Sequence, residues 1–411
     1  MAKEVALEVL DFSALVRPGD RVVWGQGGAE PVALTERLMA QRENIGPFTV
    51  FVGMSLADSV AMAHTSQVRY QSYCGAARNR GLAREQALEI LPCHYSQISA
   101  ALAPVDVLLL QVAEGPDGFS FSAAAEYLVP LVKSARLVIA EVNAQAPWVY
   151  GESLELHDID VLVRSDRPLL EVPGAAAGEV EQAIARHIGG LVEDGSTLQL
   201  GLGSLPEAVL DCLRSHRDLG IHSGAIGNKV ADLMEAGVIT NARKARDTGI
   251  TVAGVLFGGE RIYRYAHLNR NIQLRSTDYT HSLEVLGSLD HLVTINSAIE
   301  VDLTGQINAE VAGGVYVGAV GGAMDFQRGA HASRGGLPII ALPATALGGK
   351  QSRITASLSG PVSTPRADAG LIVTEFGVAD LRGCNLRERA RRMIEIAHPD
   401  FRDALALEAN L

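Results

Sequence analysis

The run Gly220-Ile221-His222-Ser223-Gly224 places a histidine next to a serine near the middle of the sequence. A Ser-His pair can act as nucleophile and base when the two side chains meet. Consecutive residues of a β-strand point to opposite faces, so His222 and Ser223 are not expected to form such a pair. His222 is therefore either a hydrogen-bonded core residue or a side chain that positions a water molecule.

Three carboxylates are further candidates for acid-base chemistry. Glu114 follows the apolar segment 107–112, which is typical of a buried strand, and α/β sheets bind ligands where strands end. We predict that Glu114 lies in a turn and is a candidate catalytic residue. The alternative is a solvated loop carboxylate, because most glutamates in turns stay in water. Glu300 and Asp302 alternate on one predicted strand, and we interpret them as structural residues.

Two glycine-rich runs could bring backbone close to a ligand. Gly201-Leu202-Gly203-Ser204-Leu205 follows a predicted strand, and Ser204 with Glu207 three residues later predicts a capping box at a helix start. The free N–H groups of such a start suit an anion or a thioester oxygen. A plain strand-to-helix turn is the alternative, since the third glycine of a dinucleotide fingerprint is missing. The second run contains Gly318, Gly321 and Gly322, where absent Cβ atoms would let a ligand approach.

Basic residues near the C-terminus are candidates for binding phosphate. Lys350 and Arg353 flank Ser352 and follow Gly348-Gly349, in a loop that could reach a ligand. Arginine supplies paired donors to phosphate oxygens. A denser group of arginines is interpreted as a solvated helix face, offset by acids such as Glu388: Arg382, Arg387, Arg389, Arg391 and Arg392.

The elements that carry these residues fall into two similar halves. Residues 22–28 and 198–204 both predict a strand followed by a glycine turn and a helix, about 176 residues apart. A second pair of similar segments is 105–110 and 289–293, both typical of buried strands. Chance similarity between common turns is the alternative to duplication.

The order of elements predicts an α/β fold. Strands rich in Val, Ile and Leu at 137–140, 250–253 and 338–342 alternate with helical stretches, which favours buried, mainly parallel sheets. Prolines and glycines interrupt regular structure at 167–178, and helical spacing resumes at Val180. We expect two related open α/β domains, residues 1–172 and 173–411.

Composition limits the partners. With 411 residues, 47% of them hydrophobic, the chain can bury a large core. A formal net charge of -12 argues against nucleic acid and anionic membranes as partners. The N-terminus and the apolar segments predict neither a targeting signal nor a transmembrane helix. The widely spaced cysteines predict no zinc or other metal site and no disulfides, and they fit a cytoplasmic protein: Cys74, Cys93, Cys212 and Cys384.

Several long motifs resemble the acetyl-CoA hydrolase/transferase family, which includes 4-hydroxybutyrate and acetate CoA-transferases. The resemblance covers nearly the whole chain and rests on residues 138–143, 198–206, 220–223, 232–240, 295–306, 352–354, 373–383 and 396–402. It implies an active site between two α/β domains, coenzyme A as the ligand, acyl-CoA and a small carboxylic acid as substrates, and a homodimer. With coenzyme A as the expected ligand, we predict that the glycine runs contact it and that Lys350 and Arg353 bind its phosphates.

The sequence departs from the family at three places near the expected site. In the family, a glutamate after His-Ser or His-Thr attacks the acyl-CoA thioester, and Gly224 stands at that position. Ala323-Met324 replaces a segment with glutamine before Asp325-Phe326, and residues 113–119 replace a Ser-Pro-Pro-Asp turn. The three changes favour an altered reaction over a general loss of function, because the other family motifs are retained.

We therefore expect an acyl-CoA enzyme that works without a glutamyl-CoA intermediate. The simplest such reaction activates water for hydrolysis of a thioester or of a carbon–carbon bond. Ring-cleaving hydrolases of steroid breakdown resemble this fold and also lack that glutamate. Two alternatives remain: a CoA-transferase that uses another carboxylate, with Glu114 as the nearest candidate, and a non-catalytic acyl-CoA binder.

Overall fold

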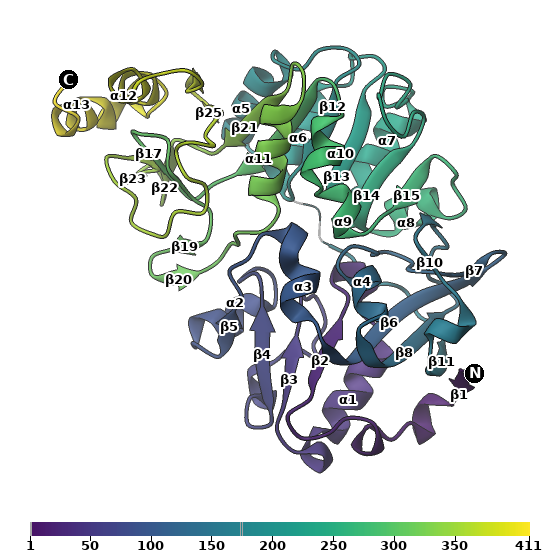
Figure 1. Cartoon of the computed structure of the whole chain (residues 1–411). Coiled ribbons are helices and arrows are strands. Elements are labelled where there is room, and N and C mark those ends of the chain that lie inside the picture. The colour runs from purple at the N-terminus through teal and green to yellow at the C-terminus, as the bar shows by residue number, and fades with distance from the viewer. Residues whose placement is uncertain (1, 173, 175) are drawn as a thin grey trace.

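The computed structural model describes residues 2–172, 174 and 176–411. The chain folds into two open, mainly parallel sheets with helices around them, one half below the other in Figure 1. The predicted α/β fold class is confirmed. The predicted domain boundary falls between residues 172 and 173, and Pro173 lies outside the described residues.

The first sheet is built from the N-terminal part of the chain. Its strand order is β1-β11-β8-β6-β2-β3-β4-β5, with β7 paired to β6 and β10 paired to β7. The central strands are buried on both faces because helices and loops cover both sides of the sheet. The strands are β1 (Lys3–Glu4), β2 (Arg21–Trp24), β3 (Phe48–Phe51), β4 (Val68–Ser72), β5 (Leu88–Ile90), β6 (Val105–Gly115), β7 (Gly118–Ser120), β8 (Ala135–Asn143), β10 (Ser153–Leu154) and β11 (Val161–Ser165).

The second sheet has the order β26-β25-β21-β16-β12-β13-β14-β15-β9. Its last strand, β9, comes from the first half of the chain and pairs with β15. The strands are β9 (Tyr150–Gly151), β12 (Thr197–Leu200), β13 (Gly220–Ile226), β14 (Thr251–Leu256), β15 (Ile272–Leu274), β16 (Leu292–Ser297), β21 (Leu337–Ala341), β25 (Leu371–Thr374) and β26 (Gly377–Asp380).

The two sheets share one topology. In each, the first long strand is central, the next three strands in sequence lie on one side of it, and the following strands lie on the other side. β2 and β12 are the two central strands, and the similar segments 105–110 and 289–293 form or lead into β6 and β16. This equivalence supports the predicted relation between the halves. It also places a topological switch point, where α/β sheets bind ligands, between β2 and β6 and again between β12 and β16.

Helices cover the two sheets, and a smaller group of strands extends from the second half. The helices are α1 (Val32–Ile45), α2 (Asn79–Arg84), α3 (Ile98–Leu102), α4 (Leu128–Val132), α5 (Glu179–Gly189), α6 (Ser204–Cys212), α7 (Asn228–Glu235), α8 (Glu260–Ala266), α9 (Thr277–Thr280), α10 (Leu283–Gly287), α11 (Ala323–Ala332), α12 (Leu386–Glu395) and α13 (Pro399–Glu408). The smaller strands are β17 (Glu300–Asp302), β18 (Ile307–Asn308), β19 (Val311–Ala312), β20 (Val315–Tyr316), β22 (Thr345–Ala346), β23 (Gln351–Ser352) and β24 (Ile354–Thr355). No helix within the described ranges has the length and apolar character needed to cross a membrane.

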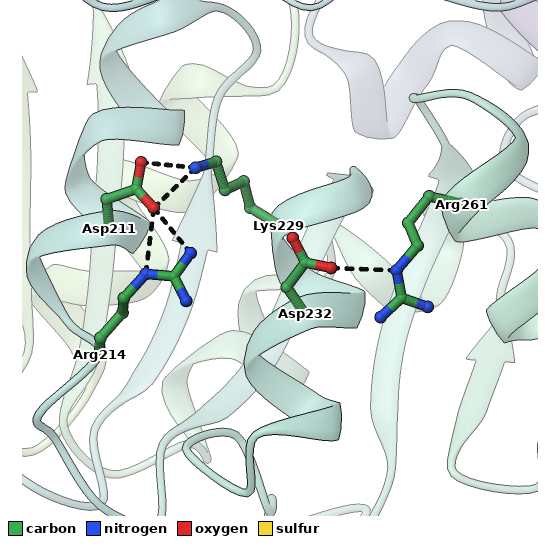
Figure 2. A network of polar contacts seen from close by, with 5 residues as sticks. All are labelled: Asp211, Arg214, Lys229, Asp232 and Arg261. Atoms are coloured by element: carbon green, nitrogen blue, oxygen red, sulfur yellow. Dashed lines mark hydrogen bonds and ion pairs between the residues drawn. The ribbon is translucent and has the colours of Figure 1, made fainter.

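Surface ion pairs join three neighbouring helices of the second half (Figure 2). Asp211 of α6 accepts from Lys229 of α7 at 2.6 Å, and Asp232 of α7 accepts from Arg261 of α8 at 3.0 Å. Arg214 also donates to Asp211. These side chains are partly exposed, so each pair contributes little to stability. They link the three helices that follow β12, β13 and β14 at the surface.

The C-terminal helices α12 and α13 lie at the yellow end of the chain in Figure 1, where α12 packs against β26 at the edge of the second sheet. The arginines of this region make local contacts. Arg392 pairs with Glu388 at 2.9 Å, and Arg389 donates to the carbonyl oxygen of Thr304 at 3.0 Å. The predicted offset of the arginines by Glu388 is thus seen for Arg392.

Candidate active site

A cavity of about 140 Å³ lies between the two halves, at the carboxyl ends of central strands from both. The first half lines it with Gln26, Tyr73, Tyr95 and Glu126. The second half lines it with residues from the ends of β12, β13, β14 and β16 and from the start of α11: Gln199, Leu200, Gly201, Leu202, Gly224, Ala225, Val255, Phe257, His281, Asn296, Gly321, Gly322, Ala323 and Phe326. Both switch points therefore face one shared cavity.

Glu126 reaches the cavity on a segment that crosses from the first half to the second. The backbone of Ala125 donates to Gly254 at 3.0 Å, and Leu256 donates to Ala123 at 2.8 Å, so the segment runs beside β14. Gly254 permits this close approach, because a Cβ there would lie 2.9 Å from the oxygen of Gly224 and 3.4 Å from the Cβ of Glu126. The Cβ of Glu126 is thereby fixed beside β14, and its side chain lines the same cavity as Gly224.

The carboxyl group of Glu126 is buried and only half satisfied. Its Oε2 accepts hydrogen bonds from the Tyr95 hydroxyl at 2.7 Å and from Nε2 of Gln26 at 2.9 Å. Its Oε1 has no hydrogen-bond partner within the described part of the chain. Burial raises the pKa of Glu126 to about 7, against the lowering effect of the two hydrogen bonds. A group with this pKa can take up and release a proton near neutral pH.

Gln26 holds the partners of Glu126 in a fixed arrangement. Its Oε1 accepts from the backbone N–H of Met54 and from the hydroxyl of Tyr73, both at 2.8 Å. Because these donors identify the oxygen, the amide nitrogen must point toward Tyr95 and Glu126. Burial raises the pKa values of Tyr73 and Tyr95 well above the usual tyrosine value, so both hydroxyls stay protonated.

Gly224 faces the same cavity and lies against His281. A Cβ at residue 224 would be 3.2 Å from Cε1 and from Nε2 of the His281 ring, and 3.6 Å from Phe326. The His281 ring packs against Phe326 and Tyr95, with ring centroids 4.6 and 5.2 Å apart. Gly322 is constrained in the same way, since its Cβ would be 2.6 Å from Nε2 of His281. The imidazole thus occupies space next to residue 224.

The protonation of His281 follows from its neighbours. Thr280 Oγ1 donates to the carbonyl oxygen of Ser276 at 3.1 Å and lies 2.8 Å from Nδ1 of His281. Because that hydroxyl hydrogen is already used, Nδ1 carries the proton and donates to Oγ1. Burial lowers the pKa of His281 to about 3, so the ring is neutral at physiological pH. Its Nε2 is left as a hydrogen-bond acceptor at the cavity wall.

His222 and Ser223 contact different elements, as the strand geometry predicts. The Nε2 of His222 donates to the carbonyl oxygen of Thr280 at 3.1 Å, and its ring is buried outside the cavity lining. Burial, followed by the charge of Lys244, lowers the pKa of His222 to about 3. Ser223 Oγ contacts N and O of Leu200, where the ladder between β12 and β13 ends after Leu198. The structure therefore favours the interpretation of His222 as a hydrogen-bonded core residue over one that positions a water molecule.

The second switch point supplies a pair of amides. Gln199 of β12 and Asn296 of β16 exchange two side-chain hydrogen bonds, at 2.9 and 3.2 Å, and both line the cavity. Each amide keeps one N–H that this exchange does not use. These groups can donate to a polar ligand in the cavity.

The glycine turn after β12 reaches the cavity through Gly201 and Leu202. The predicted capping box is wrong. Gly203 is the N-cap of α6, with φ of 115°, and no side chain caps the helix. Ser204 is already the first helical residue, because the left-handed conformation that only glycine adopts easily turns the chain at Gly203. Leu205 is buried in the core and does not line the cavity.

The second glycine run divides in two. Gly321 and Gly322 line the cavity at the start of α11, whereas Gly318 packs against the backbone, where a Cβ would be 1.9 Å from the oxygen of Ala309. Asp325 in the first turn of α11 accepts from N and Oγ of Ser96, at 3.1 and 2.7 Å. This contact joins the start of α11 to the first half of the chain.

The two predicted phosphate ligands lie outside the cavity lining. Lys350 is exposed next to β23, after the loop that contains Gly348 and Gly349. Arg353 is half-buried, and its Nη1 lies 3.5 Å from the oxygen of Ala298, shortly after the end of β16. Its Nε has no hydrogen-bond partner in the ranges that the structure covers.

Glu114 does not join the cavity. It lies within β6, not in a turn, and its carboxylate accepts from Arg164 at 2.8 Å on an exposed groove. The strand continues because β7 pairs with it in a hairpin. Glu300 accepts from Asn308, Ser359 and Gly360, so the structural interpretation of this residue holds.

The sequence analysis missed the residues that carry the polar chemistry of the cavity: Gln26, Tyr73, Tyr95, Glu126, Gln199, His281 and Asn296. Glu126 had a usable signal, because it is a lone acid after the apolar run Ala123-Ala124-Ala125. His281 and Tyr95 had none, since their contacts come from distant parts of the chain. No group of three or more His, Cys, Asp and Glu side chains in residues 2–172, 174 and 176–411 is placed to hold a metal ion.

Two related α/β halves with a buried, partly satisfied carboxyl group between them define the class of the protein, an α/β enzyme with an interdomain site. The chain belongs to the acetyl-CoA hydrolase/transferase family, whose C-terminal domain matches residues 258–409. It is 39% identical over 406 residues to the 4-hydroxybutyrate coenzyme A transferase of Clostridium kluyveri, covering 94% of this chain and 93% of that protein.

Two solved structures have the same fold as this chain. RipA from Yersinia pestis superposes with a TM-score of 0.93 at 34% identity, over 99% of this chain and 97% of that one. The 4-hydroxybutyrate CoA-transferase of Porphyromonas gingivalis gives a TM-score of 0.83 at 32% identity, with the same coverage. The predictions of a CoA-transferase fold and of an enzyme of CoA thioesters are supported.

Proposed function

We propose that the protein hydrolyses an acyl-CoA, at its thioester or at a carbon–carbon bond of its acyl group, without a glutamyl-CoA intermediate at residue 224. The observation that carries this proposal is the buried Oε1 of Glu126, which is unpartnered in the described structure and belongs to a carboxyl group with a pKa near 7. Support also comes from Gly224, which lines the cavity without a side chain.

In the proposed reaction, Glu126 acts as the general base. Oε1 takes one proton from a water molecule while the water oxygen forms a bond to the thioester carbon. The C–S bond then breaks, and the proton passes from Glu126 to the leaving CoA thiolate. The products are a carboxylic acid and CoA thiol, and Glu126 returns to its ionised form. The hydroxyl of Tyr95 and the amide of Gln26 contact the carboxyl group, and the neutral ring of His281 lines the same cavity.

The developing oxyanion would be stabilised by helix starts at the cavity. Gly322 and Ala323 lie at the N-terminus of α11, where backbone N–H groups have no acceptor within the helix. Such groups and the positive end of the helix favour negative charge. The spare amide hydrogens of Gln199 and Asn296 are further donors.

We further propose that coenzyme A binds across the turn at Gly201, Leu202, Gly203 and Ser204, with Lys350 and Arg353 at its phosphates, whereas the buried Leu205 supports the turn from the core. The cavity-lining positions of Gly201 and Leu202 support the first part. The exposed Lys350 and the unpartnered Nε of Arg353, in the structure as described, support the second. A cytoplasmic homodimer remains our proposal from composition and family resemblance, and light scattering tests the dimer.

A second candidate function is CoA transfer between an acyl-CoA and a carboxylic acid through Glu126. It is favoured by the identity to CoA-transferases over nearly the whole chain. Glu126 would then attack the thioester itself and carry CoA as a glutamyl thioester, taking the place that we first considered for Glu114.

Mass analysis of peptides after incubation with acetyl-CoA, butyryl-CoA and 4-hydroxybutyryl-CoA, with and without borohydride, separates these functions. Hydrolysis of the thioester through water predicts free CoA thiol and no adduct on any glutamate, with one oxygen of ¹⁸O-labelled water in the acid product. An adduct on Glu126 would instead establish transfer. Tight binding of all three thioesters without turnover would leave a non-catalytic binder.

A further inference from the structure

We propose that His281 is a positioning residue for the nucleophilic water. Its Nε2 would accept one hydrogen of that water while Oε1 of Glu126 accepts the other. This inference rests on the proposed hydrolysis and assigns a role that the family motifs do not contain.

The two acceptors line one cavity together with Gly224. A Cβ of residue 224 would meet the His281 ring at 3.2 Å. A Cβ at Gly254 would lie within 3.4 Å of both the Cβ of Glu126 and the oxygen of Gly224. Tyr95 touches both groups, through its hydroxyl to Glu126 at 2.7 Å and through its ring to His281. Both side chains line the same cavity.

The acceptor character of His281 is fixed by its surroundings. Nδ1 donates to Thr280 Oγ1, which in turn donates to Ser276, so Nε2 carries the lone pair. The ring is held between Phe326 and Tyr95 and cannot turn without losing this chain. Because burial keeps the ring neutral, with its pKa at about 3, it stays an acceptor across the pH range in which Glu126 titrates.

Two fixed acceptors orient a water molecule for attack. When both hydrogens are held, a lone pair of the oxygen points away from the acceptors and toward the space where the thioester carbon would lie. Only Glu126 then receives a proton, because the neutral imidazole with a strongly lowered pKa is the weaker base. A side chain at residue 224 would occupy this space, so the role of Gly224 is to leave room for the water molecule.

The test compares His281→Phe, Glu126→Gln and the wild type in hydrolysis of the three acyl-CoA esters named above. Phenylalanine keeps the aromatic contact with Phe326 and Tyr95 but removes the acceptor. We expect kcat to fall about 10- to 100-fold with KM unchanged, and the rise of kcat with pH near 7 to keep its midpoint. His216→Phe, a part-buried histidine outside the cavity lining, is the matched control and should retain wild-type kcat.

The outcomes separate the two proposals. Loss of hydrolysis in Glu126→Gln with an unchanged kcat in His281→Phe would overturn the role of His281 alone. If His281→Phe raises KM and also lowers the melting temperature, His281 acts only through packing and the positioning role is overturned. Absence of thiol release by the wild type from all three esters would overturn thioester hydrolysis and, with it, the role of His281. If His281→Phe does not fold, a crystal structure with a thioether analogue of acetyl-CoA decides, since water must then lie within hydrogen-bond distance of both Nε2 and Oε1.

Discussion

The ring of His281 lies over the α-carbon of Gly224, so closely that a Cβ on residue 224 would come within 3.2 Å of two ring atoms. The ring cannot easily give way, because Phe326, Tyr95 and Thr280 hold it from other sides. Gly224 and His281 are therefore one structural unit, joined across about 57 residues of sequence.

Gly224→Ala should destabilise the protein by about 1–3 kcal/mol, because the added methyl group overpacks the space beside His281. In a His281→Ala background the same change should cost about 1 kcal/mol less. Urea unfolding of the four proteins of this double-mutant cycle measures the coupling. Additive effects of the two substitutions would contradict the contact.

Glu126→Gln should lower kcat for thioester hydrolysis by about 10²- to 10⁴-fold, since an amide cannot accept the proton of water. In the wild type, kcat should rise with pH through about 7 and then level off, because the base works in its ionised form. The Glu126→Gln variant should not show this rise of kcat with pH. Glu114→Gln is the control, since its exposed carboxylate pairs with Arg164, and it should keep both the rate and the profile.

Glu126 should also make stability depend on pH. Its pKa is raised from 4.5 to about 7 on folding, so the folded state binds more protons than the unfolded state between these values. Stability is therefore lost as pH rises from 5 to 8. The free energy of unfolding of Glu126→Gln, relative to wild type, should increase by on the order of 2 kcal/mol over this range. If the difference in the free energy of unfolding between Glu126→Gln and wild type does not change with pH, the Glu126 carboxyl group is more exposed to solvent than the structure shows.

Gly318→Ala should cost about 3 kcal/mol or more, because its methyl group would lie 1.9 Å from a backbone oxygen. Gly81→Ala is the matched control. No atom lies within 4 Å of its added Cβ, it sits in α2, and it should gain up to about 1 kcal/mol. Thermal unfolding without any ligand distinguishes this backbone role of Gly318 from a role in binding coenzyme A.

Lys350→Ala should raise KM for acyl-CoA about 10-fold at low salt, with kcat unchanged, if the ammonium group meets a phosphate. The effect should shrink as ionic strength increases. Lys133→Ala removes another exposed lysine, at the end of α4, and should leave KM as it is. If Lys350→Ala and Lys133→Ala have the same KM for acyl-CoA, the proposal that Lys350 binds coenzyme A is contradicted.

Much of the fold was predictable because it depends on local patterns. Apolar runs marked β8, β14 and β21, and the spacing from Val180 marked α5. The similarity of residues 22–28 and 198–204 indicated two halves before their common topology was seen. The start of α6 was predicted less well, because a left-handed glycine at 203 replaced the expected cap at Ser204.

The candidate site was predictable only in part. Gly201, Leu202, Gly224, Gly321 and Gly322 line the cavity, and their glycine-rich turns at strand ends could be recognised in the sequence, whereas their roles in binding and catalysis stay predictions. The carboxylate did not follow from the sequence. Glu114 is held by Arg164, whereas Glu126 enters the cavity because its segment pairs with β14 of the other half.

By itself, the sequence determined the α/β class, the similarity of the two halves and the family, since these depend on periodicity and on contiguous motifs. Only the tertiary structure decided which polar groups meet. Glu126, Tyr95 and His281 come from separate segments, and burial in a shared cavity sets their pKa values and leaves Oε1 and Nε2 as acceptors. Such contacts between distant residues have no local pattern, because they form when the carboxyl ends of the two sheets come together.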